Sequence, residues 1–341
     1  MMKAVGYRES LPITDENALI DFELPDPQPT GRDVLVAVKA ISVNPVDTKV
    51  RRKTPPAEGE TKVLGWDASG VVQAVGPEVT LFKPGDEVWY AGSIARPGTN
   101  AELHLVDERI VGYKPKSLSH AQAAALPLTS ITAWEMLFDR LGVLPGKSQT
   151  NQSLLIIGAA GGVGSIMVQL ARRLTGLTVI GTASRPETTE WVRSLGAHHV
   201  IDHSKPLAEE LRKAGLSNVT HVASLTQTGK HFADIVDALA PQGKLALIDD
   251  PDPAELNVLL LKRKSISLHW ELMFTRALFD TPDILAQHHL LCEVADLVDA
   301  GLIRTTANQN LGPINASNLK RAHALIESGT TRGKIVLEGF D

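Results

Sequence analysis

The sequence predicts an α/β protein with two parts, a β-rich part and a doubly wound parallel sheet with helices on both faces. The length of 341 residues corresponds to roughly two domains at about 150 residues each. Short runs with strand character, separated by turn signals, occupy residues 1–127. Strand and helix patterns then alternate through residues 128–275, as they do where a sheet is built from parallel strands.

The composition is that of a globular protein and argues against several classes of function. The 34 Lys and Arg and 39 Asp and Glu residues give a net charge of −5, which opposes binding to nucleic-acid phosphates. No apolar run reaches the roughly 18 residues of a membrane span, and the N-terminus has no signal-peptide pattern. We therefore expect a cytoplasmic protein with neither a membrane nor a nucleic-acid partner. The single cysteine, Cys292, excludes an internal disulfide bond and a four-thiolate zinc site.

Four segments of the β-rich part have the β-branched or alternating pattern of strands, and their close spacing predicts a barrel or sandwich. They cover residues 34–41, 71–75, 86–91 and 101–106. Residues 51–62 combine Pro55-Pro56 with several charges and are predicted to be an exposed loop, as are residues 93–100.

Strands and helices alternate after a short helix at residues 119–125, for which Ser119 is the candidate cap. The predicted strands cover residues 154–157, 178–183, 200–202, 219–225 and 244–248, with a possible sixth at 265–270. The predicted helices between them cover residues 166–174, 187–195, 207–214 and 231–239. Beyond residue 275, the pattern indicates helices at 284–298 and 318–327 and a final strand at 334–337.

A glycine-rich turn joins the strand at 154–157 to the helix that follows it. Its residues include Gly158, Ala160, Gly161, Gly162, Val163 and Gly164, with the spacing G-x-x-G-x-x-G. Glycines let backbone N–H groups approach a pyrophosphate at the N-terminus of a helix. Such a turn can also do no more than pack a helix onto a strand. Here it opens a long array of strand–helix units, which favours dinucleotide binding.

The residues after the second strand of this array bear on the choice of dinucleotide. An NAD site usually has Asp or Glu there, which binds the ribose 2′-hydroxyl. This sequence has Ser184 and Arg185 instead, which can bond to a 2′-phosphate and pair with its charge. The sequence therefore favours NADPH over NADH. Ser184 can also cap the next helix, with Glu187 completing a capping box, and the two roles are compatible.

With these motifs, the chain resembles the medium-chain dehydrogenase/reductase superfamily, and within it the zinc-free quinone oxidoreductases of the zeta-crystallin-like branch. One motif runs from Gln152 through the glycine turn to Arg172 and departs from the quinone-oxidoreductase signature only at Asn151. The other is Gly65-Trp66-Asp67-x-x-Gly70, followed by Gly85-Asp86-x-Val88.

The resemblance implies a GroES-like β-barrel catalytic domain over residues 1–127, to which residues 276–341 return. It implies a Rossmann NADP(H)-binding domain over residues 128–275. It also implies a homodimer, which the edge strand at residues 265–274 could form.

The chain also resembles a subgroup labelled zinc-type alcohol dehydrogenase-like, but its residues do not match a zinc site. In the zinc enzymes, the ligand His stands where this chain has Trp66, and Glu stands where it has Asp67. The two cysteine ligands correspond to Asn44 and to the segment 128–132, which has no thiol. Because a catalytic zinc needs about three protein ligands, we predict no metal.

Without a Lewis acid, oxidation of a simple alcohol is difficult, whereas a quinone or an α,β-unsaturated carbonyl accepts hydride directly. We therefore predict NADPH-dependent reduction of such an acceptor in a cleft between the domains, as the resemblance also implies. Two alternatives are a zinc-dependent alcohol dehydrogenase with atypical ligands and a non-catalytic NADPH-binding protein.

The predicted catalytic residues are Asn44, Asp47, Lys49, Trp66 and Asp67, of which the first three lie in a loop after a predicted strand. Family members often place this loop near the nicotinamide, and many have Tyr where Lys49 stands. Lys49 either donates to a developing oxyanion or is a solvated lysine. Trp66 either stacks on an aromatic acceptor or packs in the core. Asp67 bonds to an acceptor-site group, to backbone or to Lys49.

Further cofactor contacts are predicted at the ends of strands and on the segment that crosses beneath the nicotinamide in the superfamily. Ser224 and Leu225 end the fourth strand of the array, and Ile248 ends the fifth. Thr129 and Thr132 stand on the crossing segment, where their hydroxyls can contact the ribose or the carboxamide.

Overall fold

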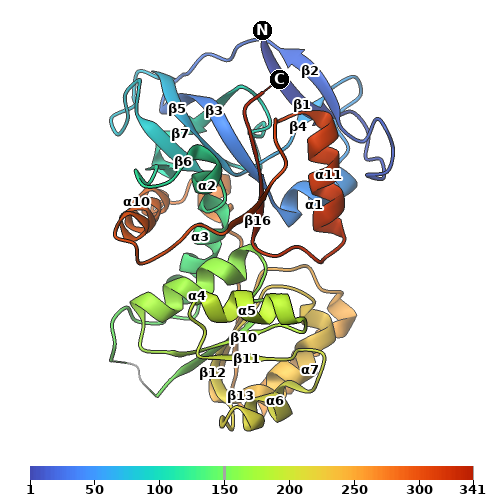
Figure 1. The fold of residues 1–341 in the computed structure, drawn as a ribbon, viewed down its shortest axis with the longest axis vertical. Coiled ribbons are helices and arrows are strands. Elements are labelled where there is room, and N and C mark those ends of the chain that lie inside the picture. The colour runs from blue at the N-terminus through green and yellow to red at the C-terminus, as the bar shows by residue number, and fades with distance from the viewer. Residues whose placement is uncertain (149–150, 341) are drawn as a thin grey trace. The chain divides into compact units, whose positions relative to one another are not determined.

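The computed structural model describes residues 1–148 and 151–340, and Figure 1 shows their fold. The chain forms two compact units, one of Met1–Ile131 with Phe274–Asp341 and one of Thr132–Met273. Unit 1 is rich in antiparallel strands, and unit 2 has one parallel sheet of six strands, which confirms the predicted α/β class. Within the described residues, no helix has the length and apolar character needed to cross a membrane.

Unit 1 contains two sheets. In the larger one the strand order is β15 (Ala307–Asn310), β16 (Lys334–Glu338), β3 (Asp33–Val43), β5 (Ala68–Val75), β6 (Glu87–Tyr90) and β8 (Val111–Tyr113), and β7 (Leu103–Asp107) also pairs with β3. The smaller one has the order β2 (Ile20–Leu24), β1 (Met2–Tyr7) and β4 (Lys62–Val63). The late strand β16 runs antiparallel to β3 with Ile335 opposite Val43, so the last residues of the chain lie against one of its first strands.

The helices of unit 1 are α1 (Pro45–Lys53), α2 (His120–Ala124), α9 (Thr275–Phe279), α10 (Leu285–Asp299) and α11 (Ala316–Glu327), with a short 3₁₀ turn at Glu108–Ile110. Helix α3 (Pro127–Trp134) begins in this unit. The predicted helices at 119–125, 284–298 and 318–327 are thus confirmed. The capping role of Ser119 is confirmed as well, because its side chain accepts from the Gln122 backbone N–H at 3.2 Å.

Helix α1 corrects two predictions. Residues 44–49 do not form a loop after β3, because Asn44 and Pro45 begin a helix that continues to Lys53. The exposed loop predicted from residue 51 is therefore wrong at its start. Arg51 is completely buried, with hydrogen bonds to the side chains of His323 and Glu327. A local run of charges indicates solvent exposure, but Arg51 can be buried because its hydrogen-bond partners, about 270 residues away in the sequence, satisfy its guanidinium group.

The segment 93–100 is irregular, as predicted, but it is not fully exposed. Gly98, Thr99 and Asn100 are buried because their backbone N–H groups bond to the carbonyls of Val63, Gly65 and Leu64 at 3.1, 2.7 and 2.9 Å.

Unit 2 has the predicted alternation of strands and helices. Its parallel strands lie in the order β11 (His199–Ile201), β10 (Thr178–Thr182), β9 (Ser153–Ile157), β12 (Val219–Ser224), β13 (Leu239–Leu247) and β14 (Ser267–Trp270), so the sixth strand is confirmed. The helices are α4 (Gly162–Leu174), α5 (Pro186–Ser194), α6 (Leu207–Lys213), α7 (Thr228–Ala238) and α8 (Leu259–Lys262), with a π-helical turn at Glu135–Arg140 and a 3₁₀ turn at Pro253–Glu255. Apolar side chains of β9, β12 and β13 form its core with α6 and α7.

Candidate active site

The glycine turn of unit 2 has the geometry of a dinucleotide-binding turn. Gly158 leaves β9 with a φ of 81°, which favours glycine, and Gly161 is the N-cap of α4. A Cβ on Gly164 would lie 2.5 Å from the backbone of Ala159, so only glycine lets the helix approach the strand this closely. Gly162, Val163 and Gly164 form the first turn of α4, whose N–H groups have no partner inside the helix. This turn can hold a pyrophosphate.

The ends of the neighbouring strands lie beside this turn. Leu225 follows β12, and its backbone N–H donates to the Ile157 carbonyl at 3.2 Å. Thr182, at the end of β10, accepts from the Gly158 N–H at 3.1 Å, a contact that the sequence analysis did not predict. Ile248 follows β13 and is half-buried. The register of parallel strands therefore brings together residues that the sequence separates.

Three side chains that were predicted to contact the cofactor through their hydroxyl groups are buried. The Ser224 hydroxyl bonds to that of Thr228 at 2.7 Å, at the start of α7. Thr129 on α3 donates to the carbonyl of Leu126, just before that helix, at 3.1 Å, and Thr132 on the same helix is buried too. The contacts of Ser224 and Thr129 stabilise helices, and sequence position alone did not indicate this.

The predicted 2′-phosphate residues line an open pocket of about 620 Å³ at the end of β10. Ser184 is exposed and Arg185 is half-buried. The pocket residues are Ala183, Ser184, Arg185, Pro186, Thr189, Glu190, Arg193, Val200, Ile201, Asp202 and Glu210. Arg193, two turns along α5, is a second cation that the sequence analysis missed.

The cap of α5 is not the predicted one. Arg185 is the N-cap residue, and its backbone N–H lies 3.3 Å from the hydroxyl of Thr188. Ser184 and Glu187 therefore do not form a capping box, because the helix begins one residue later than the prediction assumed. This leaves the Ser184 side chain in the pocket without a capping role.

Unit 1 holds a buried polar cluster that contains three of the predicted catalytic residues. Asp67 accepts hydrogen bonds from the Ser42 hydroxyl at 2.7 Å, the Asn44 amide at 3.1 Å and the Leu128 backbone N–H at 3.1 Å. It also forms an ion pair with Lys334 at 3.2 Å. Four donors surround this carboxyl, which is the environment of an ionised carboxylate. Burial raises the pKa of Asp67, and the ammonium and the hydrogen bonds oppose that shift.

Lys334 is the residue that the sequence analysis missed. It is the first residue of β16, is 3 % exposed, and donates to the Val43 carbonyl at 3.1 Å as well as to Asn44 and Asp67. No local pattern indicated a functional role for Lys334, because the sequence predicted only that it is the first residue of the final strand. The ion pair of Asp67 is thus with Lys334, a partner that the sequence analysis did not consider.

Asp47 is the second buried carboxyl of this cluster. Its Oδ2 accepts from the Asn44 backbone N–H at 2.6 Å, at the start of α1. Its Oδ1 makes no hydrogen bond of ordinary geometry to the residues that the structure describes. Burial raises the pKa of Asp47 to about 7, against the lowering effects of the Asn44 N–H and of Lys334. Asp47 can therefore hold a proton near neutral pH.

The two other predicted catalytic residues differ in their surroundings. Trp66 is completely buried, donates to the Ser93 carbonyl at 3.0 Å, and packs edge-on against Phe274 with ring centroids 6.1 Å apart. Of the two roles that the sequence left open for Trp66, these contacts favour packing in the core. Lys49 is half-buried on α1, two residues after Asp47.

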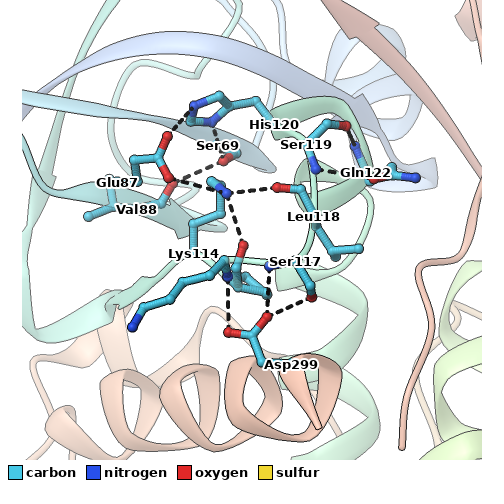
Figure 2. A network of polar contacts seen from close by, with 12 residues as sticks. Ser69, Glu87, Val88, Lys114, Ser117, Leu118, Ser119, His120, Gln122 and Asp299 are labelled. Atoms are coloured by element: carbon cyan, nitrogen blue, oxygen red, sulfur yellow. Dashed lines mark hydrogen bonds and ion pairs between the residues drawn. The ribbon is translucent and has the colours of Figure 1, made fainter. Parts of the chain in front are cut away.

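A second polar network of unit 1 surrounds Lys114 and Glu87, and Figure 2 shows it. The Lys114 ammonium lies 3.3 Å from Glu87 and donates to the carbonyls of Pro115 and Leu118 at 2.9 and 2.7 Å. Glu87 also contacts His120 at 3.2 Å, and His120 bonds to the Ser69 hydroxyl at 2.8 Å. This Ser–His–Glu arrangement does not support nucleophilic catalysis, because Ser69 is completely buried.

The residues at the family's zinc positions do not fit zinc. The Asn44 oxygen and Asp67 are both bonded to the Lys334 ammonium, and the Trp66 indole has no lone pair to offer. Within residues 1–148 and 151–340, His, Cys, Asp and Glu side chains form no group of three or more that could hold a metal. The glycine turn, in contrast, fits a nicotinamide dinucleotide.

Two known families match parts of the chain. Residues 30–126 match the alcohol dehydrogenase GroES-like domain, and residues 195–337 match a family described as zinc-binding dehydrogenase. A relative from Staphylococcus epidermidis (strain ATCC 12228 / FDA PCI 1200), named zinc-type alcohol dehydrogenase-like protein, is 38% identical over 338 residues, which cover 98% of this chain and 99% of the relative.

Two solved structures are similar over nearly the whole chain. A protein from Rhizobium etli CFN 42, whose name assigns it provisionally to the zinc-dependent alcohol dehydrogenases, is 64% identical with a TM-score of 0.96, covering 100% of this chain and 98% of that one. The Escherichia coli quinone oxidoreductase, solved in complex with NADPH, is 25% identical with a TM-score of 0.81, covering 98% of this chain and 99% of that one.

Proposed function

Because the chain belongs to the medium-chain dehydrogenase/reductase superfamily, in the subgroup that resembles quinone oxidoreductases, we propose that it is a zinc-independent, NADPH-dependent reductase of quinones or α,β-unsaturated carbonyls. The chain is an oxidoreductase of this superfamily. The acceptor class, the choice of NADPH over NADH and the independence from zinc make up the proposal.

The observation that carries the proposal is the hydrogen bonding of Lys334 at the positions of the family's metal ligands. A site whose ligand positions are bonded to an ammonium suits an acceptor that needs no Lewis acid. Quinones and α,β-unsaturated carbonyls are such acceptors, because they are already electrophilic. The bound cofactor would supply hydride, and the protein would supply orientation, a hydrogen bond to the developing oxyanion and a proton.

Two groups of unit 1 are suited to the proton and the hydrogen bond. Asp47 holds a proton near pH 7, and Lys49 stands on the same helix, where many quinone reductases have Tyr. We propose that Lys49 donates to the acceptor and that the buried Asp47 holds a proton within the same helix. Trp66 has no part in this proposal.

The pocket beside β10 supports NADPH over NADH. A 2′-phosphate there would meet the Ser184 hydroxyl and the guanidinium groups of Arg185 and Arg193. We expect Arg193→Ala to raise KM for NADPH about 10-fold, because a hydrogen bond to a charged group contributes about 1.5–3 kcal/mol. KM for NADH should not change. Arg212→Ala, at an exposed position on α6 outside the pocket, is the matched control.

Localisation and assembly belong to the proposal too. We propose a cytoplasmic homodimer that forms through β14, the last strand in the order of the six-stranded sheet. Trp270 on this strand is 53% exposed, and Leu272 just after it is exposed to the same degree. Exposed apolar side chains beside an edge strand favour association with a second strand.

The experiment that tests the proposed function measures oxidation of NADPH and NADH with a benzoquinone, a naphthoquinone, an enone and an aldehyde. Metal content is measured on the same sample. We expect turnover with NADPH and a quinone or the enone, and less than one zinc per chain. Activity confined to the aldehyde, with one zinc per chain, would indicate a zinc alcohol dehydrogenase instead. Cofactor binding without turnover of any acceptor would indicate a non-catalytic protein.

A further inference from the structure

We propose that Lys334 is a positioning residue for the reaction, because its ammonium holds the amide of Asn44 in one orientation beside Asp67. This inference rests on the proposed function and adds to it a residue from the far end of the chain. Lys334 is 3 % exposed and its ammonium is bonded to Val43, Asn44 and Asp67, so we infer that its effect on the reaction passes through Asn44.

All three N–H groups of the ammonium have an acceptor. They bond to the Val43 carbonyl at 3.1 Å, to Asp67 Oδ2 at 3.2 Å and to Asn44 Oδ1. The position of the lysine is set by the sheet, because the next residue, Ile335, pairs with Val43 across β16 and β3. The backbone ladder thus fixes the Lys334 ammonium relative to Asn44, which follows β3 directly.

The amide of Asn44 has only one orientation that satisfies its neighbours. Its oxygen accepts from Lys334, and its nitrogen donates to Asp67 at 3.1 Å. A reversed amide would place its N–H₂ against the ammonium and its oxygen against the carboxylate, which are repulsive contacts on both sides. One amide N–H is then left over in a fixed direction, and the Asn44 backbone N–H is bound to Asp47 at 2.6 Å.

The same amide orientation links the two carboxyls of the cluster. Asn44 touches Asp67 through its side chain and Asp47 through its backbone N–H, so a displacement of the whole residue would disturb both groups. The positive charge of Lys334 balances the negative charge of Asp67 in this arrangement. Removing Lys334 would leave the Asn44 oxygen without its donor, so that only the bond to Asp67 would still hold the amide.

Lys114 provides the matched control in the same unit. It too is buried and paired with a carboxylate, but its other bonds go to the carbonyls of Pro115 and Leu118, as Figure 2 shows. Within the described residues, its hydrogen bonds and its ion pair do not involve Asn44, Asp47 or Asp67. A loss of kcat that follows from the removal of any buried lysine should therefore appear in Lys114→Met as well as in Lys334→Met.

The test compares steady-state kinetics of the wild type, Lys334→Met, Lys334→Arg and Lys114→Met, with thermal unfolding measured on every sample. We expect Lys334→Met to lose about 100-fold in kcat with little change in KM for NADPH, because small misplacements at a reacting centre have effects of this size. Lys334→Arg keeps the charge but cannot donate three bonds from one nitrogen, so kcat should fall as well. Lys114→Met should keep kcat within about twofold, in line with a residue outside the site.

A double-mutant cycle with Asn44→Ala separates positioning from a general loss of stability. If Lys334 acts through Asn44, the double variant loses no more kcat than Asn44→Ala alone. Additive losses would overturn the inference, as would equal kcat in Lys334→Met and Lys114→Met. If Lys334→Met does not fold, Lys334→Arg decides, and wild-type kcat in that variant would overturn the inference. Absence of turnover in the wild type would overturn the proposed function, and this inference with it.

Discussion

Unit 1 contains two buried lysines, each paired with a carboxylate, and they differ in what surrounds the pair. The Lys334 side chain is 3% exposed and its partner Asp67 is fully buried, while Lys114 is 4% exposed and its partner Glu87 is 52% exposed. Water can therefore solvate one end of the Lys114 pair, whereas the Lys334 pair depends entirely on protein groups. Burial of a lysine therefore does not by itself define its role. When the lysine is removed, an exposed carboxylate partner can be solvated by water, whereas a buried one is left without a counter-charge.

The largest expected effect is on stability after removal of each lysine. Lys334→Met should lower the free energy of unfolding at pH 7 by about 3–5 kcal/mol, because it leaves Asp67 as an uncompensated buried carboxylate. Lys114→Met should lower it by no more than about 1–2 kcal/mol, since Glu87 can turn to solvent. Urea denaturation of both variants measures the difference. Equal losses would show that the exposure of the carboxylate does not matter.

The next effect concerns the pH dependence of stability. Burial raises the pKa of Asp47 from 3.8 to about 7, so the folded protein binds a proton that the unfolded chain has released. The contribution of Asp47 to stability should therefore decrease as pH rises from about 4 to 7, with a slope of up to about 1.4 kcal/mol per pH unit. Buried histidines such as His104 and His221, whose pKa burial lowers to about 4, contribute with the opposite sign, so the effect of Asp47 is measured as a difference between two proteins. Asp47→Asn should remove this slope in denaturation curves recorded at pH 5, 6, 7 and 8. A difference in stability between the wild type and Asp47→Asn that does not change with pH would contradict the assignment.

A smaller effect is expected for the two serines that bond to carboxylates. The Ser42 hydroxyl donates to Asp67 at 2.7 Å in the buried cluster, and the Ser117 hydroxyl donates to Asp299 at 2.6 Å at the surface. Ser42→Ala should cost about 1.5–3 kcal/mol of unfolding free energy, as for a buried hydrogen bond to a charged group. Ser117→Ala should cost less than about 0.5 kcal/mol. Thermal unfolding of both proteins in one buffer compares them, and the reverse order would refute the contrast.

The smallest effect is expected for Glu87, which pairs with both Lys114 and His120. Glu87→Gln should change the free energy of unfolding by less than about 1 kcal/mol, because its side chain is half exposed and the ion pairs are screened. Raising the salt concentration should reduce the effect further. A loss comparable to that of Lys334→Met would show that the network in Figure 2 is as well shielded from solvent as the Lys334 cluster.

Much of unit 2 could be predicted because its signals are local. The apolar run of β9, the glycines of the turn and the amphipathic helix α4 follow one another in the sequence, and each has a steric or hydrogen-bonding reason to form. The start of α5 was wrong by one residue, because Ser184 and Arg185 both lie where the helix could begin. Deciding between them requires the position of Thr188 relative to the helix.

The polar cluster of unit 1 could be predicted only in part. Asn44, Asp47 and Asp67 were found because they stand at positions where the family has ligands and neighbouring polar groups. For Trp66 the sequence left open stacking on an acceptor and packing in the core, because the contacts with Ser93 and Phe274 that favour the core come from other segments of the chain. A sequence pattern describes what a side chain can do, and the packing around it selects among those roles.

The sequence by itself determined the α/β class, the parallel array of unit 2 and the glycine turn, because these depend on patterns that repeat within a few residues. Only the tertiary structure decided that Lys334 is the partner of Asn44 and Asp67, which are 290 and 267 residues away. The physical reason is that an ion pair acts over a few ångströms between atoms, while the sequence records only order along the chain. The pairing of β16 with β3 brings Lys334 next to Asn44 although the two residues are far apart in the sequence.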